Sequence, residues 1–384
     1  MGGANEKVIP DVYVVADNII SPLGKTSANN FSALKAGETS VKQHNNTAIA
    51  NQPIFASLFD KDEDFYQDAE QKYTRFERLL IASVAAALQN GGIRINDEKT
   101  VLIISSTKGN IGLLETEDNT PELNDRISLS ASAKLIAGHF GFKNQPVIIS
   151  NACISGVLAI ITGLRLLRTG QYENAVIAGA DVISKFIVSG FQSFQALSKE
   201  VCKPFDQSRD GLNLGEGAGT VILSTRKESS QNIKVLGGAV SNDANHISGP
   251  SRTGEELAFA INNALKDAGK QAADIGFISA HGTATVFNDE MEANAITLAG
   301  LQHVPLNSLK GNYGHTLGAA GLIESIISIQ SLKQGVVLPT YGYQANGVTN
   351  TVNVCSSAIA VDADSFVKTA SGFGGCNAAV IFGR

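Results

Sequence analysis

The strongest constraint on the fold is a strand–loop–helix pattern that occurs twice along the 384-residue chain. In the first half, a β-branched segment at 147–150 leads through a polar loop into an apolar segment at 156–170. In the second half, residues 305–308 lead through a polar loop into an apolar segment at 318–335. Both apolar segments begin with small residues, which permit close packing, so we expect two helices buried between layers. The repetition predicts two related halves.

A second pair of segments supports the same duplication. Thr74 begins a T-x-x-E capping motif before an apolar stretch, and a β-branched run follows at 101–105. Thr253 begins the same motif before another apolar stretch, and a strand-like run follows at 275–280. Each motif predicts a capped helix, and each run predicts a strand. Strands that alternate with helices indicate an α/β protein.

The length and composition agree with two halves in one body. The chain exceeds the usual size of a single domain, and it contains 43% hydrophobic and 17% charged residues, which is typical of a compact enzyme. The polar stretch at 227–232 is the expected seam. We therefore predict an N-terminal half over 1–230 and a C-terminal half over 231–384 that pack as one rigid unit.

Charge and motif content exclude several classes of protein. The net charge is −6 and no run of Lys and Arg occurs, so nucleic acid is not an expected partner. The opening MGGANEKVIPDVY lacks the apolar core of a signal peptide, and Arg165 interrupts the strongest apolar run, so no membrane insertion is expected. No metal site is predicted, because HExxH and clustered ligand spacings are missing. Four cysteines without CxxC spacing favour a reducing cytoplasm: Cys153, Cys202, Cys355 and Cys376.

Cys153 is the candidate nucleophile. It follows a predicted strand and lies just ahead of a predicted helix, where unpaired N–H groups and the helix dipole favour a thiolate. Such a position can lower a thiol pKa from about 8.5 to about 3.5–7.5. A lone cysteine in an apolar run is more often buried and inert, but the polar neighbours Asn151 and Ser155 favour a reactive one.

Two histidines are candidate partners of Cys153. His281 follows a predicted strand, and His315 precedes a predicted helix, so both lie at junctions where sites are usually built. Either histidine alone would more simply be a packed structural side chain. The matching positions of all three residues favour catalysis instead. Cysteine and histidine sets also serve hydrolysis, and the spacing alone leaves hydrolysis and condensation both open.

Six separated blocks resemble the β-ketoacyl-(acyl carrier protein) synthase family of thiolase-fold condensing enzymes, in particular synthases I and II. The resemblance runs nearly end to end and keeps the order of NIISPLG, NACISG, PFDQSRDGLNLGEGAG, HGTAT, KGNYGHTLGAAG and GFGGCNA. It implies a duplicated five-layer α-β-α-β-α fold with mixed sheets, in which each half supplies one buried helix. It also implies that no cofactor is permanently bound and that the substrates are carried on the phosphopantetheine of acyl carrier protein.

The resemblance implies roles for the candidate catalytic residues. Cys153 would accept an acyl chain from acyl carrier protein, and His281 and His315 would assist the decarboxylation of malonyl-carrier protein. Two imidazoles can stabilise the resulting enolate without a metal. Lys310 would complete the catalytic set, and Glu324 would form a buried charged pair with it.

The resemblance also implies the substrate-binding groups and the partners. Thr283 and Thr285 would bind the phosphopantetheine arm, and Phe373 would gate the acyl pocket while its N–H completes an oxyanion hole with that of Cys153. Acyl carrier protein is the expected partner, and a homodimer or a heterodimer with a related synthase subunit is expected. The resemblance implies a role in fatty-acid synthesis or in polyketide or aryl-polyene synthesis. Four residues depart from the family pattern and bear on which acyl substrate is used: Ala284, Asn288, Ser371 and Cys376.

Two other functions remain open. A biosynthetic thiolase shares the fold and uses a second cysteine, a role that Cys376 could fill, but two histidines and the Lys310 block favour decarboxylative condensation. A non-catalytic partner that sets chain length is the other alternative. Such subunits usually lack the nucleophile, whereas Cys153 is present.

Overall fold

A computed structural model describes residues 9–68, 70, 72–118, 120–229, 232–244 and 249–384. Within these residues, ten strands form one continuous sheet in the order β11-β10-β14-β15-β9-β1-β8-β6-β4-β5. The joint between β9 and β1 rests on two residue pairs and divides the sheet into two halves of five strands. The predicted boundary between residues 230 and 231 lies outside the described residues.

The two halves of the sheet contain equivalent strands. The N-terminal half contains β1 (Tyr13–Ile20), β4 (Thr100–Ser105), β5 (Val147–Ile149), β6 (Asn174–Asp181) and β8 (Gly217–Ser224). The C-terminal half contains β9 (Ile233–Asn242), β10 (Phe277–Ser279), β11 (Leu306–Asn307), β14 (Ser365–Gly372) and β15 (Cys376–Gly383). Two smaller sheets contain β2 (Lys42–His44), β3 (Ile54–Ser57) and β7 (Leu214–Gly215), and β12 (Val336–Val337) and β13 (Ile359–Ala360).

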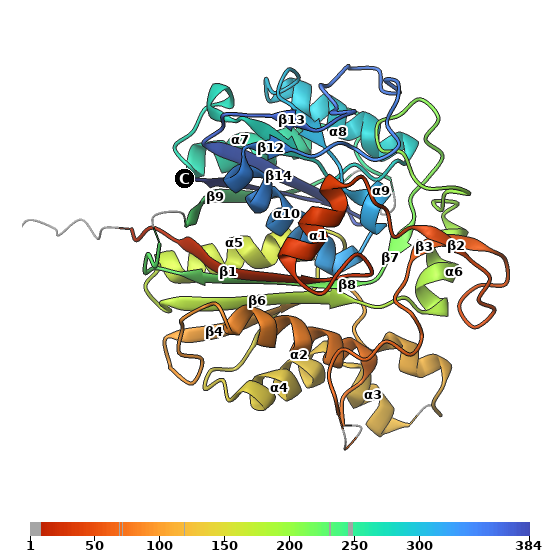
Figure 1. The fold of residues 1–384 in the computed structure, drawn as a ribbon, viewed down its shortest axis with the longest axis vertical. Helices are drawn as coiled ribbons and strands as arrows, with labels where there is room; N and C mark the ends of the chain where they lie inside the picture. The colour runs from red at the N-terminus through yellow and green to blue at the C-terminus, as the bar shows by residue number, and fades with distance from the viewer. Residues whose placement is uncertain (1–8, 69, 71, 119, 230–231, 245–248) are drawn as a thin grey trace, which may run out of the picture.

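Figure 1 shows five layers from top to bottom, which confirms the predicted α-β-α-β-α fold. The outer layers hold α7 (Glu255–Asp267) and α8 (Val286–Leu298) at the top, and α2 (Arg75–Leu88), α3 (Pro121–Ile127) and α4 (Leu129–Phe140) at the bottom. The middle layer holds α5 (Ser155–Arg168) and α10 (Ala320–Gln334). The other helices are α1 (Ser27–Lys35), η1 (Ile111–Glu115), α6 (Lys185–Ser193), η2 (Ala272–Asp274), α9 (Lys310–Tyr313) and η3 (Leu317–Ala319).

Small residues allow the two central helices to approach each other closely. A Cβ atom on Gly156 of α5 would lie only 2.8 Å from the backbone nitrogen of Leu322 in α10. A Cβ atom on Gly321 would lie only 2.6 Å from the backbone nitrogen of Val157. Side chains at these two glycines would force the helices apart. The predicted close packing is therefore confirmed.

The register of the strands confirms the duplication. β6 and β8 pair antiparallel over eight residues each, from Asn174 opposite Ser224 to Asp181 opposite Gly217. β14 and β15 pair in the same way over eight residues each. β6 also pairs in parallel with β4, and β14 pairs in parallel with β10, so both halves are mixed sheets. Counting along the two equivalent strands places Ile177 of β6 and Lys368 of β14 at the same position.

One of the two predicted capping motifs is confirmed and the other is wrong. Thr74 caps α2, because its side chain accepts from the backbone N–H of Glu77 while the Glu77 carboxylate accepts from the N–H of Thr74. Thr253 does not cap α7, which begins after Gly254 in a left-handed conformation with φ of 77°. A Cβ atom on Gly254 would lie 2.5 Å from the carbonyl oxygen of Met291 in α8. Packing against α8 therefore decides where α7 begins.

Candidate functional site

The structure brings Cys153, His281 and His315 together around one cavity of about 840 Å³, between the two halves. The two imidazole centroids are 5.3 Å apart and their planes meet at 81°. Thr283, Thr285 and Phe373 also line this cavity. Six of the residues that the sequence singled out are thus neighbours in space. The N-terminal half supplies the thiol, and the C-terminal half supplies both imidazoles.

The loop before α5 holds Cys153 at the cavity wall. The hydroxyl of Ser155 accepts from the N–H of Asn151 at 2.8 Å and donates to the carbonyl of Ala152 at 2.7 Å, which closes the loop. Ala152 has φ of 44°, a left-handed conformation that L-residues rarely adopt. Strained residues of this kind persist where the surrounding structure holds them, often beside functional groups.

The expected lowering of the Cys153 pKa is wrong in direction. Burial raises the pKa of the thiol to about 12, the nearby Cys376 also raises it, and the positive charges of Lys310 and Lys108 oppose them. Because Cys153 is 7% exposed, the loss of hydration outweighs the favourable position ahead of the helix. Cys153 is therefore a neutral thiol at pH 7.

Two buried carboxylates of α8 fix the loop that carries His281. Glu292 accepts from the N–H of His281 at 2.8 Å and from the N–H of Gly282 at 2.7 Å. Asp289 accepts from the N–H of Thr283 at 3.0 Å. The hydroxyls of Thr283 and Thr285 are 2.9 Å apart and lie at the cavity wall. The two carboxylates accept from three consecutive backbone N–H groups, so the backbone that carries the His281 side chain is held in one position.

Both imidazoles are buried and uncharged near neutral pH. Burial lowers the pKa of His281 and of His315 well below 6.5, and the charges of Lys310 and Lys368 lower both further. Within the described chain, Nδ1 of His281 and both ring nitrogens of His315 have no hydrogen-bond partner. A neutral imidazole offers one N–H donor and one acceptor. The two rings can therefore donate hydrogen bonds to an oxyanion that forms in the cavity.

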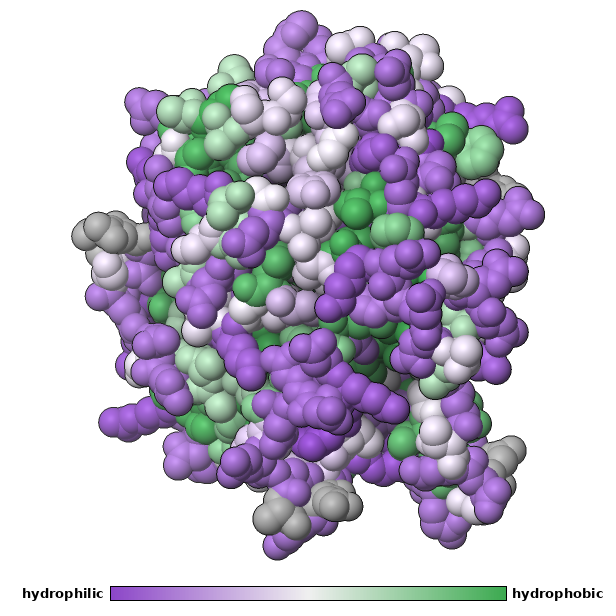
Figure 2. All heavy atoms as spheres, turned by 45° about the vertical axis from the view of Figure 1, so that its right-hand side comes forward, coloured by the Kyte–Doolittle hydropathy of each residue, from purple (hydrophilic) through white to green (hydrophobic). Residues whose placement is uncertain are grey.

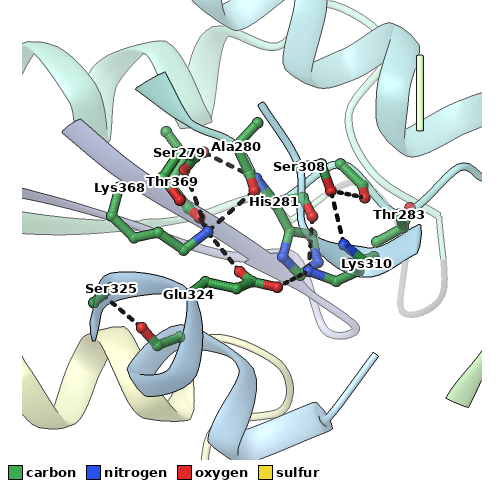
Figure 3. A network of polar contacts seen from close by, with 12 residues as sticks. Ser279, Ala280, His281, Thr283, Ser308, Lys310, Glu324, Ser325, Lys368 and Thr369 are labelled. Carbon is green, nitrogen blue, oxygen red and sulfur yellow. Dashed lines mark hydrogen bonds and ion pairs between the residues drawn. The ribbon is translucent and has the colours of Figure 1, made fainter. Parts of the chain in front are cut away.

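A cluster of three buried charged side chains lies behind the imidazoles. Glu324 of α10 contacts the Lys310 ammonium at 2.6 Å with one carboxylate oxygen and the Lys368 ammonium at 2.7 Å with the other. Lys310 also donates to the carbonyl of His281 at 2.7 Å (Figure 3). The three charged residues do not line the cavity, so Lys310 and Glu324 act on it only through their neighbours.

Sequence reasoning identified Lys310 and Glu324 but missed Lys368. A signal was available, because Lys368 stands inside the apolar run that precedes the GFGG block. A strand with buried residues on both faces seldom contains a lysine unless an acidic group pairs with it. The sequence alone did not show which acidic residue that would be.

An apolar cavity of about 800 Å³ adjoins the first one. Cys153, Phe191, Phe194 and Phe373 line both cavities. The Phe373 ring centroid is 5.7 Å from that of Phe191 and 5.1 Å from that of Phe194. Phe373 therefore lies where the two cavities meet. On the face that includes α6, apolar side chains gather in a hollow bordered by polar ones (Figure 2).

Cys376 lies behind the site and not in it. Its sulfur faces the carbonyl of Asn151 at 3.7 Å and the carbonyl of Phe373 at 3.5 Å. Cys376 is not among the residues that line either cavity. In the part of the chain that the structure describes, no three His, Cys, Asp or Glu side chains are grouped as metal ligands would be. None of the described helices is long and apolar enough to cross a membrane.

Comparisons with known proteins cover nearly the whole chain. Residues 10–229 match the family model for the N-terminal domain of beta-ketoacyl synthase, and residues 233–344 match the model for its C-terminal domain. The chain is 30% identical to the 3-oxoacyl-(acyl-carrier-protein) synthase 2 of Vibrio cholerae, over 97% of this chain and 99% of that protein.

Two solved structures have the same fold. The chain is similar to a beta-ketoacyl synthase from Burkholderia phymatum, with a TM-score of 0.88, 25% identity, and coverage of 98% of this chain and 99% of the other. It is also similar to a ketosynthase in complex with its chain length factor from Xenorhabdus doucetiae. There the TM-score is 0.86, the identity is 25%, and both chains are covered completely.

Proposed function

The chain belongs to the β-ketoacyl synthase family of acyltransferases, and from this premise we propose that Cys153, His281 and His315 carry out decarboxylative condensation. An acyl group held on Cys153 joins the two-carbon unit of malonyl-carrier protein, and the product is a β-ketoacyl thioester. One observation carries this proposal above the others. Two uncharged imidazoles with unpartnered ring nitrogens face the same cavity as a single buried thiol.

In the first step the sulfur of Cys153 attacks the carbonyl carbon of an acyl thioester. A new thioester forms on Cys153, the bond to the carrier sulfur breaks, and the carrier leaves as a thiol with the proton of Cys153. The N–H groups of Cys153 and Phe373 stabilise the oxyanion that forms on the way. A close approach supports this pairing, because a Cβ atom on Gly372 would lie 3.0 Å from the backbone nitrogen of Cys153.

In the second step the malonyl carboxylate leaves as CO₂, and its bonding electrons pass to the thioester as an enolate. The N–H groups of His281 and His315 donate to the enolate oxygen. Neutral imidazoles suit this step, because they supply donors whose charge does not hold the departing carboxylate in place. The enolate carbon then attacks the acyl thioester, a carbon–carbon bond forms, and Cys153 leaves as a thiolate that takes up a proton.

The two cavities support separate binding sites for the carrier arm and for the acyl chain. Thr283 and Thr285 line the cavity that contains the histidines, where they would bind the phosphopantetheine arm of acyl carrier protein. The apolar cavity would hold the acyl chain, with Phe373 as the gate between the two. Lys310 and Glu324 would support the site through the loop of His281. The substrates arrive on the carrier, so no permanently bound cofactor is needed.

We propose a cytoplasmic enzyme of fatty-acid, polyketide or aryl-polyene synthesis that works as a homodimer or beside a related subunit. The similarity to a ketosynthase that is bound to its chain length factor supports the second arrangement. We also propose that the halves over 1–230 and 231–384 act as one unit, because the thiol and the imidazoles come from different halves. The position of Cys376 outside both cavities counts against a thiolase.

The purified chain should be incubated with acyl-carrier protein and malonyl-carrier protein, and CO₂ and β-ketoacyl product should be measured together. We expect one CO₂ for each product. A parallel reaction with acetyl-CoA as the donor and the acceptor should give no product. Product from acetyl-CoA alone would indicate a thiolase, and no product from any pair would indicate a non-catalytic subunit.

A further inference from the structure

Lys368 is a second buried lysine of the site, and no step described above uses it. It is fully buried in β14, and its ammonium group lies 2.7 Å from Glu324. The ammonium donates to three backbone carbonyls, those of Ser279 at 3.2 Å, Ala280 at 3.1 Å and Thr369 at 2.8 Å. Ser279 and Ala280 directly precede His281 (Figure 3).

The two lysines together hold the end of β10. Lys310 donates to the carbonyl of His281, and Lys368 donates to the carbonyls of the two residues before it. Three consecutive carbonyls are therefore held by two ammonium groups on one side. On the other side, Glu292 accepts from the N–H of His281 and from the hydroxyl of Thr369 at 2.6 Å. His281 extends from a segment that charged groups fix on both sides.

The fold itself does not require this lysine. The equivalent position in the N-terminal half is Ile177, which is fully buried in β6 and pairs with Ile103 of β4. Lys368 pairs instead with Ser279 of β10. Because burying an ammonium group costs far more than burying an isoleucine, the charge at this position needs a function that β6 does not have.

The net charge of the cluster of Lys310, Lys368 and Glu324 depends on Lys368. Two cations and one anion form the cluster, so Lys310, Lys368 and Glu324 sum to +1. The titratable groups that face His281 and His315 come from every element packed against them: Lys310 of α9, Glu324 of α10, Lys368 of β14, Asp289 and Glu292 of α8, and Cys153 ahead of α5. Without Lys368, Lys310 and Glu324 would sum to zero.

We propose that Lys368 is a positioning residue for decarboxylation, which holds the end of β10 and adds positive charge beside the two imidazoles. The proposal rests on the proposed condensation and adds a residue to it. Lys368 acts through His281 and His315 and does not touch the substrate. Its removal should therefore change how the reaction depends on pH, and not only how fast it runs.

The test measures CO₂ release from malonyl-carrier protein between pH 4.5 and 8 for three proteins. In Lys368→Met the cluster sums to zero, so the imidazoles should gain a proton more readily. We expect the acid limb of the rate profile to move up by about one to two pH units, with a larger loss of rate at pH 4.5 than at pH 8. The double variant Lys368→Met with Glu324→Gln restores the sum to +1, and its acid limb should return toward that of the wild type.

Other outcomes would overturn the proposal. A loss that is equal at every pH in Lys368→Met, with no recovery of the acid limb in the double variant, would mean that Lys368 is only structural. If Lys368→Met does not fold, Lys368→Gln replaces it, because glutamine keeps a donor for the carbonyls and removes the charge. A wild-type protein that releases no CO₂ at any pH would contradict the proposed function itself, so the two failures are distinguishable.

Discussion

The two halves of the molecule have the same strand order but bury different kinds of side chain at equivalent positions. In the N-terminal half, Ile177 and Ile103 form a parallel pair beside α5, and both are fully buried. In the C-terminal half, Lys368 and Ser279 occupy the equivalent pair beside α10, where Glu324 lies. The strand pairing is the same in both halves, so the backbone does not depend on the difference. At this pair of positions the N-terminal half buries two apolar side chains, whereas the C-terminal half buries a lysine that pairs with Glu324.

The halves also divide the chemistry that we propose. The N-terminal half presents a thiol whose pKa is raised to about 12 by burial. The C-terminal half presents two imidazoles whose pKa values are lowered by burial and by two lysines. Burial thus favours the neutral form on both sides of the cavity. Neutral imidazoles can donate hydrogen bonds to the enolate oxygen without an added positive charge that would hold the departing carboxylate.

The largest expected effect separates Cys153, which lines the cavity, from Cys376, which lies behind it. Cys153→Ala should lower acyl loading and condensation by at least about 10⁴-fold, because no other side chain in the cavity is a comparable nucleophile. Cys376→Ala is the matched control and should retain loading, since its sulfur faces backbone carbonyls. Intact mass after incubation with acyl-carrier protein measures both. Equal loading in both variants would remove Cys153 from the mechanism.

The next prediction tests whether the N-terminal half can bury a lysine at the position equivalent to Lys368. Ile177→Lys would place a lysine in the N-terminal half where Lys368 lies in the C-terminal half. Ile177 lies in an apolar cluster beside α5, and α5 contains no Asp or Glu that could pair with the new lysine as Glu324 pairs with Lys368, so the free energy of unfolding should fall by about 3–5 kcal/mol. Urea unfolding followed by circular dichroism measures the loss. Ile177→Val should cost only about 0.5–1.5 kcal/mol, and equal losses would contradict the account.

The third prediction concerns the titration of Cys153. Because burial raises its pKa to about 12, the thiolate fraction should rise about tenfold for each pH unit from 7 to 10. The rate of Cys153 alkylation by iodoacetamide should follow that slope without a plateau. Mass spectrometry of the labelled peptide measures the rate, with Cys153→Ala as the blank. A plateau below pH 8 would show that the position ahead of α5 outweighs burial.

The smallest expected effect concerns a left-handed alanine in each half, Ala152 beside Cys153 and Ala284 beyond His281. Ala284 has φ of 61°, which costs an alanine about 1 kcal/mol. Ala284→Gly removes that strain but makes the unfolded chain more flexible, so stability should change by less than about 1 kcal/mol. Ala280→Gly is the control and should destabilise by about 1 kcal/mol, because Ala280 has an ordinary φ. Urea titration that ranks the two variants in the opposite order would contradict this.

The parts of the fold that depend on local sequence were predictable. The β-branched run before Cys153 and the small residues of α5 and α10 predicted the central layer, and Thr74 predicted the start of α2. Thr253 failed as a cap because the close approach of Gly254 to α8 overrides the local preference. The T-x-x-E motif at Thr253 does not show that α8, which lies elsewhere in the sequence, packs against the start of α7.

The grouping of the candidate site residues was predictable where they stand in recognisable sequence blocks. Cys153, His281 and His315 were found in this way, and the structure places them around one cavity. The pKa of Cys153 was predicted in the wrong direction because burial is a property of the folded molecule. Lys368 was missed for a similar reason, since its partner Glu324 lies in another element and only the fold brings the two together.

The central claim is that the thiol of one half and the imidazoles of the other perform separate steps. The most direct test is the intact mass of His281→Ala and His315→Ala after incubation with acyl-carrier protein and malonyl-carrier protein. The account predicts that the acyl adduct accumulates on Cys153 in both variants while CO₂ release falls by about 10²–10³-fold, as for the loss of a transition-state donor. Variants that release CO₂ at the wild-type rate, or that carry no adduct, would contradict it.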